Sequence, residues 1–419
     1  MTQLINRNGL LIMSYSFYLL PLSLMTGPFV PGLLLTLIAI IFLFLTFKDK
    51  EFKYYSNSFF FISLIFYFII LISSILSDYI LFSLESSLFY FRFLIFALAT
   101  WYLIEKNDKF ISIFTYVLLA TFIFAIVDGY YQYINDQSIF GFSNEHPFRL
   151  TLPLDDKLYM GGYLSRIFPL LLALLIFNFK LKIINYIFLG LLLIITDVLV
   201  YISAERTALV LLSVSTLTIL ILMSKFKLLR LCTIVFSLII IISISFISPE
   251  IKERNIDHTM SQIGINKESN KINLFSPRHE SHFIGAIKMF SSNKIIGVGP
   301  NVFRKVCHLE EYKHNNLTCT SHPHNTYLQL LAETGIIGFF IYCIFLFYVV
   351  KILIQHFFSI IRKKEPLITD YQVCLIATIL LTLWPLAPTL NFFNSWINII
   401  YFLPIGFYLH TIYSKLRSD

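Results

Sequence analysis

Long apolar runs with few charges fill most of the chain, and they constrain its fold more than any other feature. A helix needs about 20 apolar residues to cross the roughly 30 Å hydrocarbon core of a bilayer, and the sequence repeats runs of that length. Charged residues make up 13% of the 419 positions, about half the fraction expected of a soluble globular chain. The sequence therefore excludes a soluble fold and predicts an all-α polytopic membrane protein.

About twelve segments have the length and composition of a membrane-spanning helix. They lie at 10–27, 29–47, 57–76, 86–104, 110–129, 159–178, 183–203, 207–223, 231–248, 335–353, 371–388 and 395–413. The first two segments are joined through a turn rich in glycine and proline, from Gly27 to Gly32, and they could instead form a re-entrant hairpin. The parity of the remaining spans would survive that change, so the expected sides of the later loops stay the same.

Lysine and arginine residues are concentrated on alternate loops between these segments. This set holds 17 of the 32 cations: Arg7, Lys48, Lys50, Lys53, Lys106, Lys109, Lys180, Lys182, Lys225, Lys227, Arg230, Lys351, Arg362, Lys363, Lys364, Lys415 and Arg417. Because short cytoplasmic loops are enriched in Lys and Arg, this side is predicted to be cytoplasmic, with both termini on it. The net charge of +8 follows from cations that flank apolar segments and does not indicate a nucleic-acid partner.

Two long polar segments, 130–158 and 249–334, fall on the opposite side, where we expect any chemistry to occur. A structureless loop as long as the second segment is improbable, and Phe283, Ile284 and Ile287 fit one face of a helix within it. We therefore expect three parts, which are an N-terminal membrane bundle of about nine spans (1–248), a mainly helical outer subdomain (249–334) and about three C-terminal spans (335–419).

Two arginines on the outer side stand where an anion could bind. Arg206 lies at the outer end of a span, and its planar guanidinium group is suited to phosphate oxygens. It could instead be an interfacial anchor or the partner of Glu205. Arg278 opens a predicted helix, where a cation opposes the helix dipole unless an anion is bound nearby. A solvated surface arginine is the alternative reading of that residue.

Seven of the ten histidines fall within 249–334, which raises the question of a metal centre. His279 and His282 are three positions apart. The zinc-protease motif HExxH separates its two histidines by four positions and places the glutamate between them. The spacing therefore does not match that motif, and the sequence predicts no metal site.

A sharper pattern is His322-Pro323-His324-Asn325, which leads into an apolar helix. Pro323 favours an extended conformation for the residue before it, and Asn325 can cap a helix that begins at Thr326. His324 is thereby placed at a helix start, where a neutral imidazole could take a proton from an attacking hydroxyl. A histidine with only structural hydrogen bonds is the alternative.

A longer signature surrounds this pattern. The sequence from His322 to Gln329 continues into Ala332 to Gly338, and it is preceded by Arg278 and by the turn Gly297-Val298-Gly299-Pro300. Together these residues resemble the signature of the O-antigen ligase and polymerase superfamily. The similarity covers roughly 200–345 in detail and the whole chain in hydropathy. Ligases and several polymerases share this signature.

The resemblance implies a membrane glycosyltransferase of the GT-C type that acts on the outer, periplasmic face of the bacterial inner membrane. Such an enzyme takes a glycan from undecaprenyl diphosphate and passes it to an acceptor hydroxyl, which in ligases belongs to lipid A-core. It uses no nucleotide sugar, metal or other cofactor. Arg206 and Arg278 match the family's arginines that hold the diphosphate. His324 matches its essential histidine, which orients or deprotonates the acceptor.

Elementary chemistry favours the same reaction. A glycosyl diphosphate already carries a good leaving group, so the protein needs cations for the developing charge and a base or positioning group for the hydroxyl. Attack from the face opposite the diphosphate would invert the anomeric centre. Supporting contacts could come from His322, Asn325, Arg149 and Arg166, although Arg166, inside a span, could equally reach the interface.

Three other functions fit parts of the sequence. A polymerase that joins lipid-linked repeats would need the same motifs as a ligase. A lipid-linked glycan transporter would fit the number of spans, but transporters often show paired broken helices in two similar halves, and the halves of this chain are unlike. A structural assembly partner would have no need of Arg206, Arg278 or His324.

Cys307 and Cys319 are twelve positions apart in the outer segment, whereas the other three cysteines lie in spans. If that compartment is oxidising, the two should form a disulfide just before His322. Two free thiols are the alternative.

Overall fold

The computed structural model describes residues 2–142, 149–178, 183–263 and 275–414, and these contain helices and no strand. The cations Lys180, Lys182, Lys415 and Arg417, expected on the cytoplasmic side, lie outside the described residues. An all-helical fold is what the apolar runs predict.

A helix covers at least part of each predicted span. These helices are α1 (Thr2–Ser23), α2 (Phe29–Lys48), α3 (Ser58–Ile75), α4 (Ile80–Ser87) with α5 (Phe91–Lys106), α6 (Phe110–Asn135), α7 (Met160–Asn178), α8 (Ile183–Ile202), α9 (Arg206–Leu222), α10 (Lys227–Ile247), α15 (Thr326–Ile361), α16 (Asp370–Thr382) and α17 (Ser395–Tyr413). Within the described residues, nine helices are long and apolar enough to cross a membrane, with α4 and α5 counted as one, while α9 and α16 are shorter apolar helices. The protein is therefore a multi-pass membrane protein, and the count of twelve spans stays a prediction.

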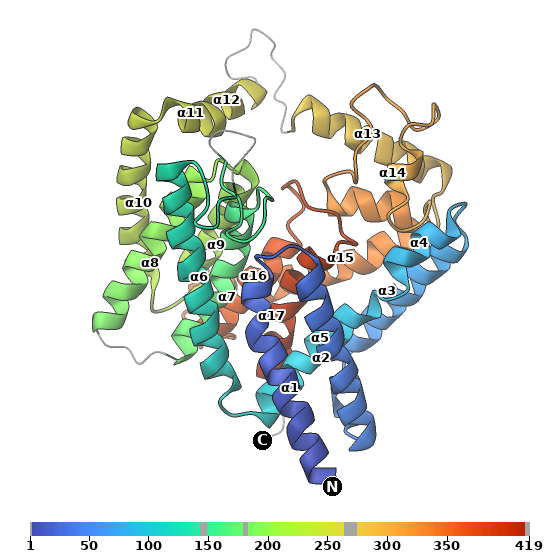
Figure 1. Cartoon of the computed structure of the whole chain (residues 1–419), viewed down its shortest axis with the longest axis horizontal. Helices are drawn as coiled ribbons and strands as arrows, with labels where there is room; N and C mark the ends of the chain where they lie inside the picture. Colours follow the sequence, from blue (N-terminus) through green and yellow to red (C-terminus); the bar gives the residue numbers. More distant parts are fainter. Residues whose placement is uncertain (1, 143–148, 179–182, 264–274, 415–419) are drawn as a thin grey trace.

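The remaining helices lie between α10 and α15. They are α11 (Pro249–Lys252), a π-helical turn at Glu253–Asp257, α12 (His258–Ile263), α13 (Pro277–Ser292) and α14 (Phe303–Val306); a short 3-10 helix at Phe52–Tyr55 lies between α2 and α3. Figure 1 shows both chain termini at the lower end of the view and α11 to α14 at the upper end. This arrangement puts the long segment at the end of the bundle opposite the termini.

Separate hydrophobic cores in the bundle and in the long segment support this arrangement. The larger core runs through the bundle, where α5 packs against α17 and α7 against α16. The core of the long segment is formed by residues from α13, from α14 with its flanking loops, and from the start of α15: Ala286, Met289, Val302, Phe303, Val306, Cys307, Tyr312 and Ala332. The predicted inner face of α13 is wrong in one respect, since Ile287 is exposed and Ser281, His282 and Gly285 are buried. At Gly285 a Cβ atom would lie 2.6 Å from a methyl group of Thr318, so α13 lies too close to this neighbour for a larger residue there.

A kink in α15 connects the long segment to the bundle. Gly335 has φ 65° and ψ −168°, a conformation that side chains other than glycine rarely adopt. The kink leaves the carbonyl groups of Ala332 and Glu333 free to accept hydrogen bonds from the N–H groups of Val298 (2.9 Å) and Gly299 (3.0 Å). Two parts of the sequence signature are thereby held together by main-chain hydrogen bonds.

The predicted span at 371–388 is wrong at its C-terminal end, since α16 ends at Thr382 and 383–394 contain no helix. Pro385 and Pro388 explain this ending, because proline has no N–H group to donate within a helix. The irregular segment 383–394 runs directly against the loop that carries His324, as the hydrogen bonds described below show.

One cation of the predicted cytoplasmic loops is also placed differently. Arg230 lies in the first turn of α10 and is 3% exposed. Its guanidinium group donates to both carboxylate oxygens of Asp197 on α8, at 2.7 and 2.9 Å. The prediction that Arg230 lies on a loop is wrong, because the buried carboxylate of Asp197 draws the arginine between the helices.

Candidate active site

Four histidines from two separate segments meet at the upper end of the bundle. His279 and His282 come from α13, whereas His322 and His324 come from the loop before α15. The ring centroid of His324 lies 4.1 Å from that of His322, 5.5 Å from that of His279 and 5.6 Å from that of His282. His324 therefore stands at the centre of the group, which we call the histidine cluster.

Hydrogen bonds to backbone carbonyl groups orient two of these rings. His282 is buried, and its Nδ1 lies 3.0 Å from the carbonyl oxygen of Thr318. His322 is also buried, and its Nε2 lies 3.0 Å from the carbonyl oxygen of Thr389, in the irregular segment 383–394. Because a carbonyl can only accept, each of these ring nitrogens must carry a proton. The rings are thus fixed with one tautomer each.

The backbone around His324 follows the sequence prediction closely. Asn325 is the N-cap of α15, and its side-chain oxygen accepts hydrogen bonds from the N–H groups of Tyr327 (3.0 Å) and Leu328 (3.1 Å). His324 itself has φ 58°, and its carbonyl oxygen accepts from the N–H group of Thr389 at 2.9 Å. The cap and this hydrogen bond hold the histidine in a left-handed conformation.

The electrostatic surroundings keep the histidine cluster neutral. The pKa of His324 is lowered to about 3. Burial is the largest cause, the three neighbouring histidines act in the same direction, and a hydrogen bond to the backbone of Thr389 acts against them. Burial also lowers the pKa of His322 and of His279 to about 4, and it lowers the pKa of His282. Each ring is therefore uncharged near neutral pH and has the form that can accept a proton.

The two predicted arginines both act on this cluster. Arg206 is the first residue of α9, and Arg278 is the second residue of α13, which is capped by Ser276. Both side chains are exposed at the surface of the protein. The pKa of His279 is lowered mainly by burial and next by the neighbouring His282. The charges of Arg206 and then Arg278 lower it further. His279 thus follows Arg278 directly on α13, its ring centroid lies 5.5 Å from that of His324, and the charge of Arg206 acts on it.

Glu205 organises the adjacent turn between α8 and α9. Its carboxylate accepts hydrogen bonds from the N–H groups of Gly161 (2.7 Å) and Gly162 (3.2 Å), at the start of α7. A Cβ atom at Gly161 would lie 2.3 Å from the Oγ of Ser203, so only glycine allows α7 to begin this close to the turn. The prediction of an ion pair with Arg206 finds no support, because no salt bridge joins the two side chains among the described residues.

Two further predicted residues surround Glu205. Burial raises the pKa of Glu205 to about 7, while Arg149 and then Arg166 lower it along with the two glycine N–H groups. Arg166 is 7% exposed inside α7, and its Nη1 donates to the carbonyl of Gly162 at 3.0 Å. Arg149 and Arg166 thus lie near the turn that carries Arg206, and Arg166 does not reach the surface.

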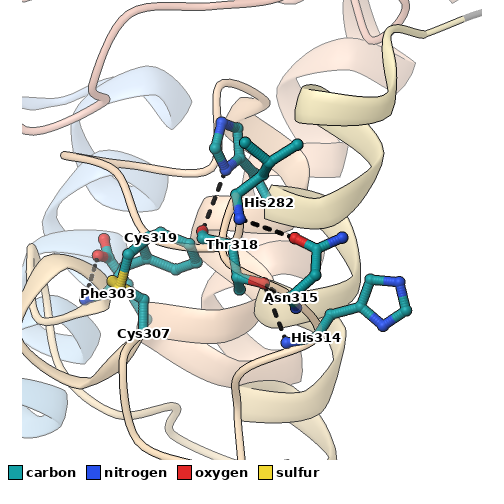
Figure 2. Close-up of a disulfide and its surroundings, with 9 residues drawn as sticks. His282, Phe303, Cys307, His314, Asn315, Thr318 and Cys319 are labelled. Carbon is teal, nitrogen blue, oxygen red and sulfur yellow. Dashed lines mark hydrogen bonds between the residues drawn. A yellow bond between two sulfur atoms is a disulfide. The ribbon is translucent and has the colours of Figure 1, made fainter.

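Cys307 and Cys319 form a disulfide near His282 of the histidine cluster (Figure 2). Thr318, next to Cys319, accepts the hydrogen bond from His282 through its carbonyl and accepts two more at Oγ1, from the N–H groups of His314 and Asn315, both at 2.9 Å. The disulfide therefore closes the loop that fixes the ring of His282.

Sequence reasoning missed three contributors to this site. Thr389 binds the His322–His324 loop but lies one residue after the span predicted at 371–388, in a connection to which no role was assigned. Glu205 was considered only as a partner of Arg206, whereas it caps α7. Arg254, in the π-helical turn, donates from Nε to the carbonyl of Ala204 at 3.0 Å. The two prolines in 383–394 were a usable signal for the first of these, and no pattern in the sequence pointed to Arg254.

No group of three or more His, Cys, Asp or Glu side chains in the described part of the chain is placed to bind a metal ion. The histidine cluster illustrates why, because ring nitrogens of His282 and His322 are directed at backbone carbonyl groups. What the site offers instead is a neutral proton acceptor with cations nearby. That combination suits the transfer of a group from an anionic leaving group to a hydroxyl.

The fold and this site define a polytopic membrane protein with a basic site at the end of its helical bundle that lies opposite the termini. Residues 188–343 match the family model for O-antigen ligase, and the resemblance to the O-antigen ligase superfamily is thereby confirmed. The matched range contains Arg206, Arg278 and His324. No curated protein sequence matches the chain significantly. The match supports a membrane glycosyltransferase of the O-antigen ligase or polymerase kind, with lipid-linked glycan substrates.

Proposed function

We propose that the protein is an O-antigen ligase-type glycosyltransferase that moves a glycan from undecaprenyl diphosphate to a hydroxyl of lipid A-core. One observation carries the proposal, which is the convergence of Arg206, Arg278 and His324 around His279 from three separate parts of the chain. This is the set of groups that the reaction requires. The reaction takes place on the periplasmic face of the inner membrane, and the site's position at the end of the bundle opposite the termini is consistent with that (Figure 1).

In this mechanism the two arginines bind the diphosphate of the donor. A guanidinium group can donate two parallel hydrogen bonds to phosphate oxygens, and both side chains are exposed to a ligand. As the bond between the sugar and the diphosphate breaks, negative charge grows on the leaving oxygen. Fixed cations at that position stabilise the transition state more than the ground state.

His324 takes the proton of the acceptor hydroxyl. The oxygen of that hydroxyl attacks the anomeric carbon from the face opposite the diphosphate, so one glycosidic bond forms, one glycosyl–phosphate bond breaks and the configuration inverts. The electron pair of the broken bond leaves with undecaprenyl diphosphate, and the proton goes to the imidazole. This chain's residues supply both functions without a metal ion or another cofactor in the scheme.

His322 and Asn325 have supporting roles in this proposal. His322 contacts the ring of His324 at 4.1 Å and is tied to Thr389. Asn325 caps α15 and donates from Nδ2 to the carbonyl of Pro385 at 2.9 Å. Both residues position His324 against the irregular segment 383–394.

The test uses the purified protein with a lipid-linked glycan donor and candidate acceptors, and it measures released undecaprenyl diphosphate together with the glycosylated product. We expect release only when an acceptor is present. His322→Ala should reduce the rate less than His324→Ala. His314→Ala is a matched control, because His314 is exposed and lies outside the histidine cluster. Movement of the intact donor across the membrane without release would instead indicate a transporter.

A deletion of the gene distinguishes a ligase from a polymerase in a cell that makes long surface polysaccharide. Loss of a ligase should leave full-length chains on the carrier lipid and a bare core. A core that carries a single repeat would show that the protein is a polymerase and would refute the ligase proposal.

A further inference from the structure

The π-helical turn at Glu253–Asp257 is fastened to the turn between α8 and α9 by two side chains. Nε of Arg254 donates to the carbonyl of Ala204 at 3.0 Å. Nδ2 of Asn255 donates to the carbonyl of Tyr201 at 2.8 Å, and Asn255 is buried. Ala204 has φ 54°, a left-handed conformation that turns its carbonyl out of the helix. These two hydrogen bonds hold Arg254 within a few ångströms of the turn that carries Arg206.

Arg254 is surrounded by charges of its own sign. Burial is the largest cause that lowers the pKa of Arg254. Arg149 and Arg206 lower it further, and Glu205 raises it. The carboxylate of Glu205 is already occupied by the N–H groups of Gly161 and Gly162. The charges of Arg149, Arg206 and Glu205 therefore all act on Arg254. Guanidinium groups gathered near one turn favour the binding of an anion between them.

The side chain of Arg254 is also free to bind a ligand. It is exposed, and only its Nε is used in the contact with Ala204. Its two terminal nitrogens have no hydrogen-bond acceptor among the described residues. A guanidinium group held through Nε presents its terminal nitrogens as a fork, which is the geometry that binds phosphate oxygens in pairs.

We propose that Arg254 is a third arginine of the donor site, and that with Arg149 and Arg206 it binds a diphosphate group at the turn between α8 and α9. The inference rests on the proposed function for the identity of the donor, but the anion site is defined by this chain's own residues. In this proposal the arginines contact the diphosphate from two sides. Arg254, Arg149 and Arg206 hold the diphosphate from the side of the turn, and Arg278 approaches it from α13, nearer to His324.

The deciding variant is Arg254→Gln. The side-chain nitrogen of glutamine occupies the position of the arginine Nε, so the variant keeps a donor for Ala204 and loses the charged fork. Arg254→Ala removes both. Lys252→Ala is a matched control, because Lys252 is an exposed cation two positions away with no hydrogen bond to the turn within the described residues. Arg206→Ala is the positive control.

The probe is inorganic pyrophosphate, titrated into the full-length protein in nanodiscs of a neutral phospholipid. Loss of a charge-assisted hydrogen bond should weaken binding roughly tenfold to a hundredfold. We expect this loss in Arg254→Gln and Arg254→Ala and none in Lys252→Ala. Wild-type affinity for pyrophosphate in Arg254→Gln would overturn the proposal, because the residue would then only fasten the turn. An equal loss in Lys252→Ala would overturn it as well, since the effect would then be one of overall charge.

Two further measurements are needed. The first distinguishes a diphosphate from a single phosphate as the ligand, and the second tests the anion site separately from the proposed function. Inorganic phosphate should bind at least tenfold more weakly than pyrophosphate to the wild-type protein, because three guanidinium groups match two phosphates. Equal affinities would indicate a site for a single phosphate, such as a phospholipid headgroup, and would overturn the diphosphate assignment. The transfer assay is read separately. A wild-type protein that binds pyrophosphate through Arg254 but releases no undecaprenyl diphosphate would refute the proposed function and leave the anion site standing.

Discussion

Removal of the Cys307–Cys319 disulfide should loosen the loop that holds His282 and thereby disturb the histidine cluster. The two cysteines are 12 positions apart. The chain-entropy model assigns a crosslink of this loop length about 3 kcal/mol. Since 1.4 kcal/mol is a factor of ten, the loop should open roughly a hundredfold more often in the double variant Cys307→Ser/Cys319→Ser. The effect should be local, because the larger core does not include these cysteines.

Hydrogen–deuterium exchange of the protein in nanodiscs measures this opening directly. The N–H groups of His314 and Asn315 are bonded to Thr318 at 2.9 Å, and they should exchange about a hundredfold faster in the double variant. Helices of the main bundle should keep their protection. Cys343→Ser is the control, because Cys343 is a free cysteine on α15.

Two results would refute this reasoning. Exchange at His314 and Asn315 that stays within a factor of two of the wild type would show that the loop does not depend on the crosslink. Thiol labelling of both Cys307 and Cys319 in the non-reduced protein would show that the bond does not form. If the loop opens as expected, transfer should fall as well, because the ring of His282 loses its carbonyl acceptor at Thr318.

Three further predictions concern the reaction and the topology. Arg206→Ala, Arg278→Ala and His324→Ala should each lower transfer roughly a hundredfold or more while the protein still accumulates in the membrane, and lysine at the two arginine positions should not restore it, because an ammonium group cannot make the bidentate contact. The pH profile of kcat/KM should stay flat from pH 8 to about pH 5, since a base with a pKa of about 3 is not yet protonated there; a tenfold loss between pH 6.5 and 5.5 would contradict a buried, neutral His324. A reporter that works only in the cytoplasm should be active after Lys364 and inactive after Lys313, and the reverse result would place the histidine cluster on the cytoplasmic side.

The sequence was sufficient for the elements that depend on local patterns. Apolar runs predict helices because burial in lipid requires every backbone group to be bonded within the segment. The loop before α15 was equally predictable, because Pro323 and Asn325 act on their immediate neighbours. In the structure Asn325 is the N-cap and α15 begins at Thr326. Local chemistry therefore located His324 at a helix start.

The sequence was misleading where a polar segment enters an apolar stretch. The run 371–388 has the hydropathy of a span, yet α16 ends at Thr382 and the next residues supply the carbonyl groups of Pro385 and Thr389 to the histidine loop. Average hydropathy does not reflect that Pro385 and Pro388 lack the backbone N–H groups that a helix would need. In membrane proteins such irregular backbone occurs where it is buried in protein or lines a polar site.

Contacts between distant parts of the chain could not be predicted from one sequence. Arg254 lies about fifty positions after Ala204, whose carbonyl it binds, and Glu205 lies 44 positions after Gly161, whose N–H group it accepts. Neither pair has a fixed spacing that a motif could encode. Such contacts depend on how helices pack, and the packing of α7 against the turn requires the missing side chain of Gly161.

The neutral histidines and the nearby arginines belong to one site, and we expect them to couple donor binding to the basicity of His324. In the free site, burial and the neighbouring histidines hold the pKa of His324 at about 3, which makes it a weak base. Arg206 and Arg278 act in the same direction on His279. A bound diphosphate would bring negative charge to those arginines and favour the protonated form of the imidazoles near them, so we expect the pKa of His324 to rise when the donor binds. His324 should therefore be a stronger proton acceptor in the complex than in the free site, and we expect the pKa that limits kcat to be higher than the one that limits kcat/KM; equal values in the two pH profiles would refute this coupling.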